Sequence, residues 1–191
     1  TLKYGPDLNN NDILDGSENF SITYEAGSVG TAANLPNAVT VAAGSSQTVT
    51  DNVPTAEDWL FIGWSVMPDE DYAGNSMPTG TGENFTMPLS NVTFTAQWTA
   101  DENNDGVADS EQVTITFRIE GNTKGFAEFT HADQTWPDGT TADIVTRQTP
   151  GAALIYPQGV ETPDDNIAPE GWNPPLPANV PGTNTMYTLT Y

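Results

Sequence analysis

The chain has 191 residues, of which 26 are acidic and only 4 basic, so its formal net charge is −22 at pH 7, and it contains no cysteine. Four basic side chains cannot form a patch for nucleic acid or for an anionic membrane surface, so we expect no nucleic acid partner and no direct membrane binding. Disulfides and thiolate metal sites are excluded, and cations are the natural counter-species of so acidic a chain.

The first elements in chain order are a short strand and an acidic loop. The opening "TLKY", residues 1–4, resembles "TLTY" at 188–191. We therefore interpret residues 1–4 as the last strand of a preceding module, which would make the chain part of a longer array. Residues 5–18 form an acidic loop that contains "DLNNNDILDGSE" at 7–18.

Polar and apolar residues alternate in four segments, which are "FSITY" at 20–24, "VTFTAQW" at 92–98, "VTITFRI" at 113–119 and "MYTLTY" at 186–191. Such alternation is typical of half-buried strands in antiparallel sheets. Turn residues separate the segments, and 17 glycines with 15 prolines leave little room for long helices. The sequence predicts a mainly β, β-rich α+β fold, with short helices expected only at 55–60 and 141–148.

The chain also repeats itself. An acidic loop precedes an alternating strand twice, and a Gly-Trp pair follows in each half, at Gly63-Trp64 and Gly171-Trp172. This repetition predicts two small modules, residues 19–100 and 113–191, joined by an acidic linker at 101–112. Each module should have its own core, with its tryptophan packed on the sheet. The side chains expected to be buried are Phe20, Ile22, Tyr24, Val92, Phe94, Val113, Ile115, Phe117, Tyr187 and Leu189.

The first module carries "FSITYEAGSVG", "FIGWSVMPDEDYAGNSMP" and "FTMPLSNVTFTAQW" between residues 20 and 98. These segments resemble the internalin B-repeat family, also called Listeria–Bacteroides repeats. The second module is similar to it more loosely, through "APEGWNPPLPANVPGTNTMYTLTY" at 168–191. The resemblance implies β-grasp-like modules, in which a small sheet wraps round a short helical segment. It also implies tandem modules of bacterial cell-surface proteins that act as spacers or adhesive units and are not enzymes.

The two acidic loops have the residue spacing of a twelve-residue calcium loop. Calcium (Ca²⁺) takes six to eight oxygen ligands, and such a loop supplies them from positions 1, 3, 5, 7, 9 and 12, with the backbone carbonyl at position 7. The first loop offers Asp7, Asn9, Asn11, the Ile13 carbonyl, Asp15 and Glu18. The second loop offers Asp101, Asn103, Asp105, the Val107 carbonyl and Asp109, with either Glu111 or Gln112 as the last ligand.

Each loop departs from the pattern at one position. Asp12 replaces the glycine of the sharp turn in the first loop, although aspartate tolerates a left-handed conformation. The second loop keeps Gly106 but has Gln112 at position 12, with the glutamate one residue earlier at Glu111. Both loops resemble EF-hand-like and dockerin-like calcium loops, although each leads into a strand rather than a helix. The alternative interpretation is a solvated acidic linker.

Other residues give weaker signals. Trp136, in "DQTWPDGT", has no counterpart in the first module and is a candidate for an exposed contact with a sugar. His131 is the only histidine, and no motif links it to a nucleophile. The many carboxylates do not single out a catalytic pair. An isopeptide crosslink at Lys124 is a further alternative.

The sequence therefore predicts a non-enzymatic, secreted region of a bacterial surface protein, at the cell surface or in the cell wall. Its modules would extend the polypeptide or act as an adhesin, stiffened by calcium at the loops, and neighbouring modules would be partners. The alternative is a module that binds carbohydrate or a host protein through exposed aromatics such as Trp136.

Overall fold

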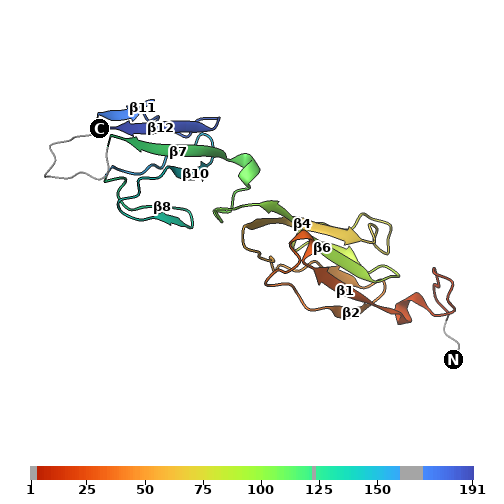
Figure 1. Cartoon of the computed structure of the whole chain (residues 1–191). Helices are drawn as coiled ribbons and strands as arrows, with labels where there is room; N and C mark the ends of the chain where they lie inside the picture. The colour runs from red at the N-terminus through yellow and green to blue at the C-terminus, as the bar shows by residue number, and fades with distance from the viewer. Residues whose placement is uncertain (1–3, 122–123, 160–169) are drawn as a thin grey trace. The chain divides into compact units, whose positions relative to one another are not determined.

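The computed structural model describes residues 4–121, 124–159 and 170–191, and it is mainly β. The chain divides into two compact units, residues 1–99 and 100–191, each with its own sheet (Figure 1). The predicted β-rich, two-module fold is thus confirmed. Helical structure in the described part is confined to three-residue 3₁₀ turns, and no helix there is long and apolar enough to cross a membrane. Most of the strand expected at residues 1–4 lies outside the described residues.

The first unit is built on a four-stranded sheet with the order β2-β1-β6-β4. Its first and last strands are parallel neighbours in the centre, and β2 pairs with β1 in the antiparallel direction. A separate antiparallel pair joins β3 to β5. The elements are η1 (Asp15–Ser17), β1 (Asn19–Glu25), η2 (Gly27–Val29), β2 (Val39–Ala42), β3 (Ser46–Thr48), β4 (Trp59–Met67), β5 (Asn84–Thr86) and β6 (Val92–Ala100).

The second unit has a sheet of the same design, with the order β10-β7-β12-β11. Here too the first and last long strands, β7 and β12, are parallel neighbours, and β10 pairs with β7 in the antiparallel direction. The hairpin β8–β9 is a separate two-stranded sheet. The elements are η3 (Asp109–Glu111), β7 (Val113–Glu120), β8 (Phe129–His131), β9 (Gln134–Trp136), β10 (Ile144–Gln148), β11 (Gly171–Asn173) and β12 (Thr185–Thr190).

Each sheet buries one face, as the alternation predicts. Phe94 on β6 of the first unit and Phe117 on β7 of the second are fully buried, each on one of the two parallel central strands of its sheet. Trp64 is 2% exposed, and Trp172 packs half-buried against the second core, which confirms the core interpretation of both Gly-Trp pairs. The predicted core residues Phe20, Tyr24 and Val113 are partly buried against these clusters, and the other seven are buried.

The predictions of short helices at 55–60 and 141–148 are both wrong. Residues 144–148 form strand β10, in which β-branched side chains alternate between buried and exposed and pair with β7. Residues 55–60 form two bridge residues, a turn at 57–58 and the start of β4, and Asp58 in that turn has a left-handed φ of 63° that an α-helix does not accommodate. The helical segment implied by the family resemblance is absent from the described residues.

Candidate metal centres

The first residue of each acidic loop folds the following backbone around its carboxylate. Asp7 accepts hydrogen bonds from the N–H groups of Asn11 (3.1 Å) and Asp12 (3.0 Å). In the same way, the Asp101 carboxylate accepts hydrogen bonds from the N–H groups of Asp105 (3.1 Å) and Gly106 (3.0 Å). The two loops therefore begin with the same turn, built from the same positions.

The middle of each loop is also the same. The position-5 side chain accepts the N–H of position 7 at 2.9 Å in both loops, Asn11 from Ile13 and Asp105 from Val107. Positions 4 and 6 are left-handed in both, with φ values of 56° and 65° in the first loop and 49° and 81° in the second. Asp12 therefore adopts the left-handed conformation expected of it, at the position that Gly106 fills in the second loop.

Each loop closes through its ninth residue. The Asp15 carboxylate accepts the N–H of Leu8 at 2.9 Å, and the Asp109 carboxylate accepts that of Glu102 at 3.4 Å. A three-residue 3₁₀ turn starts at that residue in both loops and leads directly into the first strand of the unit. The first, fifth and ninth residues are thus held at fixed places by backbone hydrogen bonds.

The last ligand position is occupied by Glu18 in the first loop and by Gln112 in the second. Glu18 accepts hydrogen bonds from the side-chain amides of Asn9 (3.2 Å) and Asn11 (2.7 Å). Gln112 donates to the Asp105 carboxylate at 2.6 Å, as Asn103 does at 3.1 Å. Glu111 lies exposed within the 3₁₀ turn. Of the two alternatives for position 12, the geometry places Gln112 beside the other candidate ligands.

Three buried side-chain oxygens of the second loop accept no hydrogen bond among the described residues; one, Asp109 Oδ1, has an ion pair with Arg147, and the other two are amide oxygens. Asn103 is only 4% exposed, and its Oδ1 has no hydrogen-bond partner among the described residues; the same holds for the buried Oε1 of Gln112. A buried acceptor without a partner costs free energy of about 1–3 kcal/mol unless something supplies positive charge. Both oxygens belong to residues at ligand positions. The residues present therefore suit a hard cation.

Each loop is fastened to the unit that follows it. In the first unit the Tyr72 hydroxyl donates to Asp15 at 2.8 Å, and Asp15 is 2% exposed. This hydrogen bond to a carboxylate raises the pKa of Tyr72. In the second unit Arg147 of β10 contacts Glu102 (2.7 Å) and Asp109 (3.2 Å), and the hydrogen bond to Glu102 raises the Arg147 pKa.

The donor set explains which metal each loop suits. Within the described residues no group of three or more carboxylate or imidazole side chains converges as a metal cage. The loops instead alternate carboxylates with amides and add a backbone carbonyl, and such all-oxygen, partly neutral sets suit Ca²⁺. The carbonyls of Ile13 and Val107 lie at the positions that would complete each set.

Searches against known protein families, curated proteins and solved structures find no match.

Some site residues were not anticipated from the sequence. Arg147 and Tyr72 hold the ninth loop residues, but they lie far from the loops along the chain. The scarcity of basic residues could have predicted an ion pair at Arg147, because each of only four basic side chains is expected to contact a carboxylate in so acidic a chain. Lys124, the candidate for an isopeptide crosslink, has an interaction partner in the structure.

Proposed function

We propose that the protein is a calcium-binding, non-enzymatic pair of β modules from a bacterial surface protein, located outside the cell at its surface or in its wall. Its role is to extend the polypeptide as a stiffened array. The observation that carries the proposal is the shared hydrogen-bond scaffold of the two loops, together with the two unpaired, buried amide oxygens of the second loop. The family resemblance of residues 20–98 supports the surface location.

In the proposed bound state, one ion is ligated in each loop by positions 1, 3, 5, 7, 9 and 12. Rotation of the Asn103 and Gln112 amides about their last bonds would turn both oxygens toward the ion near Asp105. The carboxylate would then be neutralised by the ion instead of by two N–H donors. In the first loop, Glu18 would provide two oxygens and the amides of Asn9 and Asn11 one each.

The expected affinity suits an extracellular role. Sites of this kind in extracellular modules bind with dissociation constants on the order of 10⁻⁴–10⁻³ M. At a calcium concentration about ten times the dissociation constant, each site would stabilise its unit by about 1.4 kcal/mol. Such an increment orders a loop without being required for folding of the hydrophobic core.

The mechanical consequence concerns the second loop. It begins at Asp101, directly after β6 ends at Ala100, and it leads into β7 at Val113. Residues 101–112 open the second unit, so an ion that crosslinks them would stiffen the chain directly next to the connection between the two units.

Small-angle scattering tests the proposal. With 5 mM calcium, roughly ten times the expected dissociation constant, the distribution of molecular dimensions should be narrower than with a chelator. Asp101→Asn, which weakens calcium binding to the second loop, should reduce this difference, and Asp7→Asn, the matched control in the other loop, should retain it. Identical scattering with calcium and with chelator would contradict the role of calcium in stiffening the array.

A further inference from the structure

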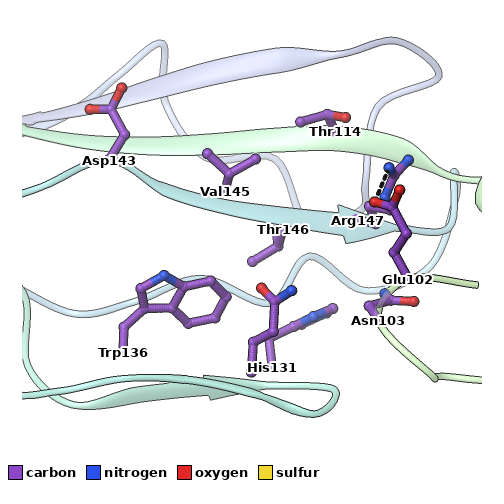
Figure 2. A pocket seen from close by; sticks show the side chains of 10 residues that line it. Glu102, Asn103, Thr114, His131, Trp136, Asp143, Val145, Thr146 and Arg147 are labelled. Atoms are coloured by element: carbon purple, nitrogen blue, oxygen red, sulfur yellow. Dashed lines mark hydrogen bonds and ion pairs between the residues drawn. The ribbon is translucent and has the colours of Figure 1, made fainter. Parts of the chain in front are cut away.

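A pocket of about 410 Å³ lies within the second unit (Figure 2). Trp136 and His131 come from the hairpin β8–β9, and Arg147 and Asp143 lie on or just before β10. Asn103 and Glu102 of the acidic loop line the pocket at the Arg147 end. The volume is within the range of small-molecule sites.

The aromatic part of the pocket is rigidly supported. Trp136 stacks on Phe129 with ring centroids 5.6 Å apart and planes 30° apart, and Phe129 is part of the buried core. The β8–β9 register places Trp136 directly opposite Phe129. The indole is half-buried and borders the pocket, so it offers a fixed flat apolar surface to a ligand.

The charges that line the pocket are already compensated. Asp143 is held by two hydrogen bonds from Arg118, at 2.7 and 2.9 Å, which lower the Asp143 pKa. Arg147 contacts Glu102 at 2.7 Å. Burial lowers the pKa of His131, although Asp105 acts in the opposite direction. The pocket therefore presents paired charges, and the net charge of −22 repels an anionic ligand.

We infer that this pocket binds an uncharged saccharide, whose C–H face stacks on Trp136 while its hydroxyls contact the polar lining. A hydroxyl is both donor and acceptor, so it can bond to the amide of Gln134 and to the paired carboxylates without disturbing their ion pairs. A purely apolar ligand would leave these polar groups unpaired. Trp136 and Gln134, which carry the proposed contacts, are not calcium ligands, although Asn103 and Glu102 of the acidic loop line one end of the pocket.

The test is an array of neutral oligosaccharides built from hexoses and N-acetylhexosamines, probed with the intact chain in calcium. Retained glycans are then titrated against the chain by calorimetry. We expect at least one neutral glycan to bind, Trp136→Phe to weaken it at least tenfold, and Gln134→Ala to weaken it several-fold. Gln134 is exposed, so its variant should fold even if the tryptophan variant does not. Trp59→Phe, at a tryptophan of the first unit that is 41% exposed, is the matched control and should not change binding.

The inference is overturned if no neutral glycan binds, if only anionic glycans bind, or if binding is insensitive to both pocket variants. It is also overturned if Trp59→Phe has the same effect as Trp136→Phe. Repeating a positive titration with Asp101→Asn separates the two proposals, because glycan binding that survives without the loop's calcium supports a pocket that works independently.

Discussion

The loops at 7–18 and 101–112 share a backbone scaffold but differ in what surrounds it. Three backbone features coincide position by position, namely the turn around the first carboxylate, the left-handed fourth and sixth residues, and the closure by the ninth. At position 3 Asn103 of the second loop is 4% exposed whereas Asn9 of the first is exposed to solvent, and at position 9 the order is reversed, with Asp15 2% exposed and Asp109 half-buried. One local sequence pattern therefore sets the loop geometry, while contacts with the rest of each unit, such as Tyr72 with Asp15 and Arg147 with Asp109, decide how far each oxygen is removed from water.

The loops also carry opposite imperfections. The first has a carboxylate at position 12 but a strained aspartate at position 6, and the second has glycine at position 6 but an amide at position 12. A carboxylate ligand adds attraction for the ion, and a glycine makes the folded loop less costly. We therefore expect the two loops to bind calcium with similar strength.

The largest expected effect comes from the first ligand of each loop. Asp101→Asn and Asp7→Asn keep the side-chain shape but remove a charge, so each should weaken calcium binding to its own loop by about tenfold to a hundredfold, or ~1.4–2.8 kcal/mol. Calorimetric titration should then show loss of one site per variant and of both in the double variant. Asp133→Asn, which alters a neighbour of Asn104 outside the ligand set, is the control. Identical calcium titration curves for all variants would contradict calcium binding at the two loops.

Exchanging position 12 sharpens the comparison next. Gln112→Glu should strengthen calcium binding to the second loop by about tenfold, and Glu18→Gln should weaken the first loop by a similar factor, because a bidentate carboxylate is gained or lost. Glu111→Gln is the matched control, since Glu111 lies outside the ligand cluster. If Glu111→Gln weakens binding while Gln112→Glu does not strengthen it, position 12 is one residue earlier than the structure indicates.

The sixth position tests the cost of the turn itself. Gly106 has φ of 81°, and a Cβ there would meet nothing within 4 Å, so a substitution costs backbone conformation alone. Gly106→Val should lower the free energy of unfolding of the second unit by about 1–2 kcal/mol, and Gly106→Asp, which copies the first loop, should cost less. Chemical denaturation in a chelator measures both. Equal losses for valine and aspartate would mean that the conformation of this turn is not the limiting factor.

The smallest effects concern the residues that fasten the loops. Arg147→Gln should destabilise the second unit by about 0.5–1 kcal/mol at low salt and by less at high salt, because partly exposed ion pairs are screened. Tyr72→Phe should lower the melting temperature of the first unit with little salt dependence, since it removes a hydrogen bond to the buried Asp15. Melting curves at 20 mM and 1 M salt, either side of roughly 0.1 M where the Debye length is ~10 Å, distinguish the two. The same salt dependence in both variants would contradict the view that Arg147 acts through an ion pair and Tyr72 through a hydrogen bond.

Local patterns in the sequence predict much of this structure. Alternation placed the cores around Phe94 and Phe117, and ligand spacing led to the two loops whose scaffolds coincide. The errors arose where tertiary pairing decides the outcome. The segment 141–148 has helix-compatible spacing, but its pairing with β7 makes it strand β10. Arg147 and Tyr72 were missed because contacts over tens of residues leave no local pattern.

The most direct test of the account is a crystal structure of the chain grown with calcium and measured for anomalous scattering. The account predicts one strong peak in each loop, surrounded by oxygens at about 2.3–2.6 Å. In the second loop the ligands should include Asp101, Asp105, the Val107 carbonyl and the two amide oxygens that now lack a partner, those of Asn103 and Gln112. Density for water alone in both loops, with these amides unmoved, would contradict the calcium assignment and leave the loops as acidic turns.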